Sequence, residues 1–242
     1  MCEGDPARRD PGLRLSTYAD REALARALAA HVAEAVRARL ARDGAAALAV
    51  SGGRTPTRFF ALLSEAPLEW GKVAVTLVDE RWVPETSERS NAALARAHLL
   101  VGRAAAARFV PLYRGGPSPE SDLADAEAAV AALSLPFAAV VLGMGDDGHT
   151  ASFFPHGEGL AAAIDPGTQR LLAPVRAPAA GEPRITFTLP PLLAADAVFL
   201  HIEGAGKRRV LDAALEDGPE TDMPVRAVLR HARRPPDVLW CP

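Results

Sequence analysis

The segment GMGDDGHTAS, residues 143–152, brings together the residue types that acid–base chemistry uses. It holds His149, with Asp146 and Asp147 just before it, among several glycines. A neutral imidazole can take a proton from water and return it to a leaving group, and a nearby carboxylate can orient the ring. A lone loop histidine usually has no such role. This loop, however, follows an apolar run and carries its own carboxylates, so we predict a catalytic His149.

Two other kinds of chemistry find less support in this segment. It has no second His or Cys at ligand spacing, so no metal is predicted, although Asp146 and His149 with a remote ligand stay open. Ser51 in VSGG and Ser152 in TASFF do not match the G-x-S-x-G pattern of a hydrolase nucleophile. A serine nucleophile is therefore not predicted.

The segment SGGRTPT, residues 51–57, has the composition of a phosphate-binding turn. Gly52 and Gly53 let the backbone approach a ligand, Ser51 and Thr55 add hydroxyls, and a helix start after them would offer free N–H groups to an anion. It matches neither the Walker pattern nor G-x-G-x-x-G. A plain strand–helix turn explains the segment equally well, and both readings stay open.

Three further polar stretches hold charged candidates. Asp79 in DERWVP could act as a base or as a positioning carboxylate, and Arg81 could bind an anion. The alternative is a surface ion pair. Lys207 in EGAGKR could bind a phosphate or be a solvated helix residue. Arg184, which leads RITFTL, could be a binding group or an edge-strand charge.

The elements around these stretches predict an α/β fold. Asp20 is a helix N-cap type, and apolar residues recur every four positions across 24–36, which indicates a helix ending near Gly44. Pro56 and Ser90 mark further helix starts. Apolar runs typical of strands alternate with such helices, which predicts a mainly parallel twisted sheet with helices on both faces. In such sheets ligands bind outside the carboxyl ends of the strands, where the polar stretches fall. The strand runs include 45–50, 72–80, 136–143, 184–189 and 197–204.

Bulk properties limit the classes of protein. The chain has 242 residues, of which 49% are hydrophobic and 24% charged, with a net charge of −3. We predict a single domain over 13–242 after a loose arm at 1–12. No basic face points to nucleic acid, and no run has the length of a membrane span. Without an apolar signal core a cytoplasmic protein is expected, with Cys2 and Cys241 as free thiols.

Five segments, given at the end of this paragraph in chain order, resemble the 6-phosphogluconolactonase family. The resemblance runs from about residue 13 to the end. It implies hydrolysis of 6-phospho-D-glucono-1,5-lactone in the oxidative pentose phosphate pathway by a carboxylic ester hydrolase. It also implies a Rossmann-like, NagB/RpiA-like fold shared with glucosamine-6-phosphate deaminases, no metal and no organic cofactor. We expect a monomer or weak homodimer. The segments are LAVSGGRTPTRFFALL, VTLVDERWVPETSERSNAALARAHLL, VVLGMGDDGHTASFFP, RITFTLPPLLAADAVFLHIEGAGKRRVL and PVRAVL.

The resemblance also implies roles for individual residues. The family's histidine falls on His149 as general base, and its aspartate before the Gly-His pair falls on Asp147, which leaves Asp146 as a turn residue. The carboxylate that opens DER falls on Asp79. Substrate- and phosphate-binding positions fall on Ser51, Gly52, Gly53, Thr55, Arg81, Arg184 and Lys207.

Two rival functions remain. Glucosamine-6-phosphate deaminases carry a glutamate five positions after their histidine, and this chain has Phe154 there, which favours lactone hydrolysis. A non-catalytic sugar-phosphate sensor would need a DNA-binding helix-turn-helix, and the dozen broken residues before the domain do not fit one.

Overall fold

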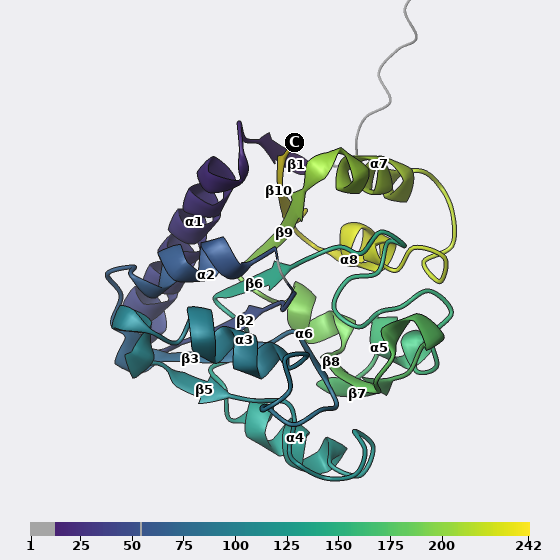
Figure 1. Ribbon diagram of the computed structural model, residues 1–242, viewed down its shortest axis with the longest axis horizontal. Coiled ribbons are helices and arrows are strands. Elements are labelled where there is room, and N and C mark those ends of the chain that lie inside the picture. The colour runs from purple at the N-terminus through teal and green to yellow at the C-terminus, as the bar shows by residue number, and fades with distance from the viewer. Residues whose placement is uncertain (1–12, 54) are drawn as a thin grey trace, which may run out of the picture.

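The structure is a computed structural model, and it describes residues 13–53 and 55–242. The arm predicted at 1–12, with Cys2, lies outside the described residues. A seven-stranded sheet forms the centre, and all its paired strands run parallel (Figure 1). In spatial order the strands are β1 (Arg14–Thr17), β10 (Asp237–Cys241), β9 (Ala197–Glu203), β6 (Ala139–Leu142), β2 (Ala46–Val50), β3 (Val73–Leu77) and β5 (Arg108–Val110).

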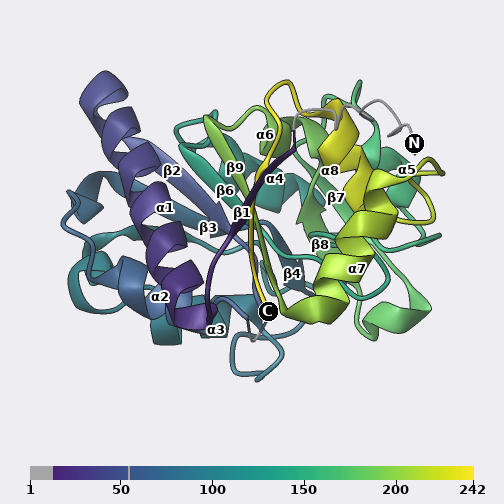
Figure 2. The ribbon, with the colours of Figure 1, turned by 90° about the horizontal axis from the view of Figure 1, so that it is seen from above.

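Helices cover both faces of this sheet, as predicted. The longest, α1 (Arg21–Asp43), begins where Asp20 accepts a hydrogen bond from the Ala23 N–H at 2.8 Å, and it ends at Gly44. Figure 2 shows α1 and α2 (Thr57–Ser64) on one side of the sheet, with α6, α7 and α8 on the other. The remaining helices are α3 (Asn91–His98), α4 (Leu123–Ala131), α5 (Leu160–Ile164), α6 (Leu189–Leu193), α7 (Gly204–Leu215), α8 (Val225–His231) and the 3₁₀ turns Trp70–Lys72, Gly102–Ala106 and Pro178–Ala180.

A second, three-stranded antiparallel sheet was not foreseen from the sequence. Its order is β4 (Asp79–Arg81), β8 (Arg184–Phe187) and β7 (Leu172–Val175). The run 72–80, predicted as one strand, divides at Val78, and the strand predicted over 184–189 ends at Phe187 because α6 begins at Leu189. Local apolar patterning cannot tell which sheet a strand joins.

Val78 is the residue at which the two sheets meet. Its N–H donates to the Val50 carbonyl oxygen of the large sheet at 2.9 Å, and its own carbonyl accepts from the Phe187 N–H of the small sheet at 2.9 Å. Apolar packing supports the junction, since the Phe137 and Phe187 rings pack edge to face with centroids 5.2 Å apart, and both are fully buried. The second sheet is thus fixed against the first.

The strand order contains a reversal that predicts where a ligand can bind. From β2 the chain adds β3 and β5 on one side, and then returns to add β6, β9 and β10 on the other. Ligands of open α/β sheets bind in the crevice outside the carboxyl ends of the strands at such a reversal. The loops after β2 and β6 therefore border the expected crevice. In the described part of the chain, no helix is long and apolar enough to cross a membrane.

The junction of the sheets leads to a stability prediction. Replacing Phe187 with alanine empties a fully buried site at the contact between the sheets, so we expect the free energy of unfolding to fall by about 3–5 kcal/mol. Urea unfolding measures the change. Val101→Ala, at a side chain 37% exposed, serves as the control and should shift stability by less than about 0.5 kcal/mol. A comparably small effect of Phe187→Ala would show that this contact does not hold the sheets together.

Candidate active site

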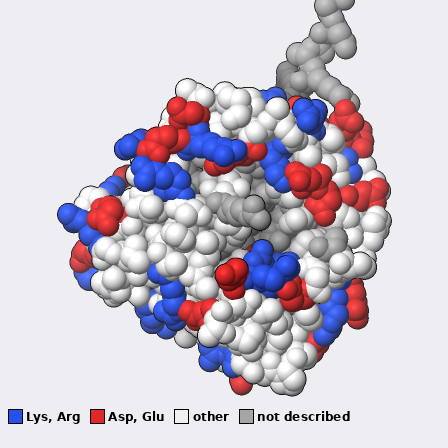
Figure 3. All heavy atoms as spheres, in the orientation of Figure 1, with Lys and Arg blue, Asp and Glu red and all other residues white. Residues whose placement is uncertain are grey.

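A cavity of about 330 Å³ opens at the predicted crevice. The face seen in Figure 3 is hollowed near its centre, with basic and acidic side chains around the hollow. Except for Asp147, which lies directly behind His149, all the site residues predicted from the sequence line this cavity. They are Ser51, Gly52, Gly53, Thr55, Asp79, Arg81, His149, Arg184 and Lys207.

The loop after β6 fixes the imidazole of His149. Its Nδ1 lies 2.6 Å from Asp147 Oδ1, and the same oxygen accepts the His149 backbone N–H at 3.1 Å. Burial acts to raise the pKa of Asp147, but these contacts with His149 outweigh it and the net shift is downward. An ionised carboxylate accepts hydrogen bonds only, so in the neutral imidazole Nδ1 carries the proton and Nε2 bears the lone pair. Gly145 permits this geometry, because a Cβ there would overlap the ring.

Phe154 forms an apolar support beneath the imidazole. Its ring centroid lies 4.6 Å from that of His149. The Arg184 guanidinium stacks on the same phenyl ring, 5.3 Å from its centroid. One buried phenyl group therefore contacts both the His149 imidazole and the Arg184 guanidinium.

Asp79 lies in the cavity but does not orient the histidine. Its Oδ2 accepts from the Ser152 hydroxyl at 2.6 Å and lies 3.7 Å from Arg184 Nη1. Burial lowers the pKa of Arg184, and the charge of Asp79 opposes that shift. The interpretation of Arg184 as an edge-strand charge is wrong, because β8 is the middle strand of the small sheet and the side chain is 8% exposed. Asp79 thus anchors that cation.

Glu80 holds the start of α3 against β4. The side chain is fully buried, and it accepts the backbone N–H groups of Asn91 at 2.8 Å and Ala92 at 2.7 Å, as well as the Ser90 hydroxyl at 3.1 Å. Burial raises the pKa of Glu80, and the backbone donors counteract part of that effect. As predicted, Ser90 caps the helix, accepting from the Ala93 N–H at 3.1 Å.

Asn91, whose backbone N–H binds Glu80, also forms part of the cavity wall. Its Nδ2 donates to the Asp79 carbonyl oxygen at 2.9 Å, and its Oδ1 is buried without a hydrogen-bond partner, pressed against Gly52. A side chain at position 52 would overlap the Asn91 amide. Gly52 is therefore glycine because another side chain fills the space its Cβ would need.

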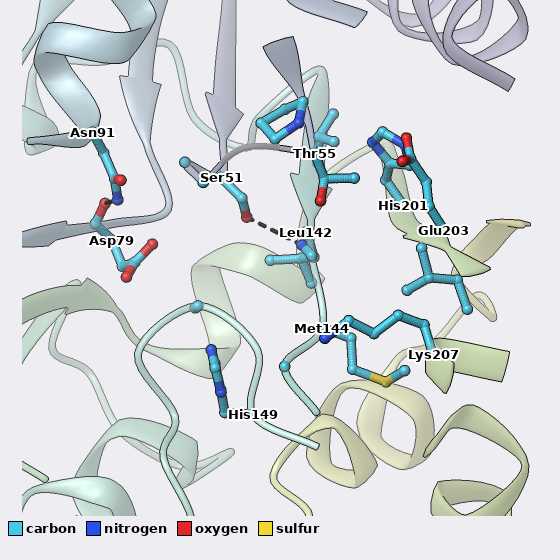
Figure 4. A pocket seen from close by; sticks show the side chains of 18 of the residues that line it. Ser51, Thr55, Asp79, Asn91, Leu142, Met144, His149, His201, Glu203 and Lys207 are labelled. Carbon is cyan, nitrogen blue, oxygen red and sulfur yellow. Dashed lines mark hydrogen bonds and ion pairs between the residues drawn. The ribbon is translucent and has the colours of Figure 1, made fainter. Parts of the chain in front are cut away.

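Figure 4 shows Thr55 and Lys207 of α7 on the side of the cavity away from Asp79 and His149, and residues 51–53 also line the cavity. The Ser51 hydroxyl accepts the Gly143 N–H at 3.2 Å, which ties the loop after β2 to the loop after β6. Lys207 Nζ lies 2.7 Å from Asp146 Oδ1. Asp146, predicted to be a turn residue only, is therefore the ion-pair partner of a lysine that lines the cavity.

Several lining or supporting residues were not predicted. Asn91 and Ser152 lie within segments that the resemblance had singled out, but their contacts depend on partners distant in sequence. His201 and Glu203 also lie within such a segment, at the end of the strand run 197–204, but only Arg184 and Lys207 were selected in that segment. Across residues 13–53 and 55–242, no three His, Cys, Asp or Glu side chains are grouped so that they could hold a metal ion.

The fold and the cavity define a doubly wound α/β protein with a small-molecule site at its topological reversal. Residues 19–240 match the family described as glucosamine-6-phosphate isomerases/6-phosphogluconolactonase, and the chain belongs to that family.

Relatives and solved structures agree with this assignment. The chain is 52% identical to the 6-phosphogluconolactonase of Mesorhizobium japonicum, over 94% of each chain. It is 47% identical to that of Pseudomonas aeruginosa, over 96% of each. A crystal structure of a 6-phosphogluconolactonase from Shewanella baltica superposes with a TM-score of 0.93 at 36% identity, covering 96% of this chain and 99% of that one. A monomeric glucosamine-6-phosphate deaminase shares the fold, with a TM-score of 0.73 at 16% identity, over 95% of this chain and 96% of that one.

The contact between Gly52 and Asn91 predicts a coupled pair of substitutions. Gly52→Ala should destabilise the protein by about 1–3 kcal/mol, because the new Cβ overlaps an amide that Asp79 holds in place. In Gly52→Ala/Asn91→Ala the amide is gone, so part of that loss should be recovered. Thermal and urea unfolding of both single variants and the double variant give the coupling energy. Gly143→Ala is the matched control, since nothing lies within 4 Å of its added Cβ. Strictly additive effects would contradict the proposed overlap.

Proposed function

We propose that this protein hydrolyses 6-phospho-D-glucono-1,5-lactone to 6-phospho-D-gluconate, the lactonase step of the oxidative pentose phosphate pathway. Membership of the family and the names of its relatives support this substrate. The observation on which the proposal depends is the bond of 2.6 Å between Asp147 and His149 Nδ1, which leaves Nε2 as a base in a cavity that also has a phosphate-type loop.

The phosphate group is proposed to bind at the end formed by the loop 51–55 and Lys207. Gly52 and Gly53 leave the backbone accessible, the start of α2 follows, and Lys207 supplies a positive charge. Asp146 forms an ion pair with Lys207, but its side chain is exposed, and exposed ion pairs contribute little free energy. A phosphate dianion can therefore replace Asp146 as the ion-pair partner of Lys207. Binding at this end places the lactone ring toward His149.

At the other end, His149 is proposed to act as the general base. As water attacks C1, its proton passes to Nε2 and a tetrahedral oxyanion forms. The cations of Arg81 and Arg184, which line the cavity, favour that negative charge. The bond between C1 and the ring oxygen then breaks, and protonated His149 returns its proton to that oxygen. Asp147 keeps the ring in the required tautomer throughout.

Removing the base tests this assignment. His149→Ala should lower kcat by about 10²–10⁴-fold with KM little changed, because general-base assistance is lost while the phosphate end is intact. Release of 6-phosphogluconate, coupled to its dehydrogenase and corrected for spontaneous ring opening, gives both constants. His98→Ala, a histidine outside the cavity, is the matched control. An unchanged kcat for His149→Ala would remove this residue from the mechanism.

The deaminase alternative is tested with its own substrate. Phe154 lies where deaminases carry a glutamate, and it is 5% exposed beneath the imidazole, so the acid–base group for proton transfer between sugar carbons is missing there. We expect no ammonia release from glucosamine 6-phosphate above the no-enzyme rate, at enzyme concentrations that hydrolyse the lactone within seconds. Ammonia release at a comparable rate would favour the deaminase.

A further inference from the structure

A histidine–carboxylate pair, of which the histidine is buried, lines the cavity and has no role in the mechanism above. His201, 4% exposed, lies with its Nε2 at 3.1 Å from Glu203 Oε1, and Arg21 Nε lies 3.0 Å from Glu203 Oε2. Both residues belong to the end of β9 and line the cavity together with Thr55 and Lys207, as Figure 4 shows. The pair is therefore part of the wall at which the phosphate is proposed to bind.

The hydrogen bond to Glu203 determines what His201 can offer a ligand. A carboxylate accepts, so the proton of the neutral ring is on Nε2 and Nδ1 bears a lone pair. That form presents no donor to a phosphate dianion. When the ring gains a second proton, Nδ1–H becomes a charge-assisted donor. The contribution of His201 to anion binding thus depends on its protonation.

The charges around the pair fit an anion subsite. Arg21, from the start of α1, compensates Glu203, so this carboxylate does not face the phosphate unpaired. On β10, Cys241 pairs in register with Glu203; burial, and then the charge of Glu203, raises the pKa of its thiol, which keeps it neutral. Asp20 also acts on that thiol from the N-cap of α1. From α7, Lys207 adds a cation, which Asp146 partners. Protonated His201 would add a further positive charge beside Lys207 at this end.

We infer that His201 is a phosphate-binding residue whose contribution requires a proton, so that substrate binding is coupled to proton uptake by the His201–Glu203 pair. This inference rests on the proposed function for the position of the phosphate. It adds His201 to the phosphate-binding residues that were expected from the sequence.

His201→Gln tests the inference. The glutamine amide can occupy the place of Nε2 and donate to Glu203, while the Nδ1 position and the positive charge are lost. At each pH, the KM of the variant is divided by the KM of the wild type. This ratio cancels the effect of the ionisation of the substrate phosphate, whose second pKa is about 6. We expect a ratio of about ten at pH 6, the size of one charge-assisted hydrogen bond, falling toward one at pH 8.5. The change in kcat should stay within about twofold.

Two comparisons separate this role from a purely structural one. Unphosphorylated glucono-1,5-lactone should be hydrolysed equally well by wild type and His201→Gln, because it has no phosphate. His31→Gln is the matched control: His31 is exposed, stacks on Phe199 of the same strand at 6.2 Å, and does not line the cavity. A KM ratio that is the same at every pH, or a loss that also affects the unphosphorylated lactone, would overturn the inference.

A binding measurement keeps this test separate from that of the proposed function. Calorimetry with 6-phosphogluconate in two buffers of different ionisation enthalpy counts the protons taken up on binding. Wild type should take up more protons near pH 7 than His201→Gln, whereas equal uptake contradicts the role of His201. If the wild-type protein binds 6-phosphogluconate but does not hydrolyse the lactone, the proposed function fails and the calorimetric result for His201 still stands.

Discussion

The site depends on one crossing of the backbone between two sheets. Val78 donates its N–H to β2 in the parallel sheet and accepts from β8 in the antiparallel sheet, so the chain leaves the first sheet and enters the second within one residue. Buried backbone groups must be paired, and this residue has one partner in each sheet. The next residues, Asp79–Arg81, are consequently delivered to the carboxyl edge of β2 and β6. Without the crossing, the DER segment would not reach the histidine loop.

Several close contacts then fix the loops of the site relative to one another. Glu80 binds the first turn of α3, which places Asn91, and Asn91 fills the space beside Gly52. On the other side, the Ser51 hydroxyl accepts from Gly143, at the start of the histidine loop. The contacts of Glu80 are buried, and together these contacts join loops that are distant in sequence, so the site is organised without a ligand. Such preorganisation lowers the cost of positioning a substrate.

The sequence predicts this molecule best where the signals are local. Helix ends follow from the chemistry of one helical turn. The structure confirms the predicted N-caps at Asp20 and Ser90 and the predicted helix end at Gly44. The parallel sheet follows from alternating strands and helices, and the loops that follow its strands converge as expected. The second sheet could not be predicted, because hydrogen bonding at Val78 depends on a partner in β8 that is remote in sequence.

The same distinction holds within the site. Asp146 and Asp147 both lie close to His149 in sequence, so the sequence could not decide which of Asp79, Asp146 and Asp147 orients the ring. The structure places Asp147 Oδ1 2.6 Å from His149 Nδ1. The part played by Asp79 depends on Ser152 and Arg184, which only the fold brings together. The pairing of Asp146 with Lys207 likewise depends on where α7 docks, and a turn signal contains no such information. Long-range partners, rather than residue types, are what sequence reasoning lacks here.

In the proposed function, phosphate binding and proton transfer take place at different parts of the cavity, and this arrangement has an energetic consequence. Positive charge from Lys207, with the loop 51–55, lies at one end, while the imidazole and its phenyl support lie at the other. A δ-lactone opens readily, so the catalyst needs orientation more than strong activation. Binding energy from a remote phosphate can provide that orientation, because it restricts the lactone relative to Nε2 without contacting the reacting carbon. A proton-dependent contact at the phosphate end would adjust this binding energy with pH and leave the base at the other end untouched.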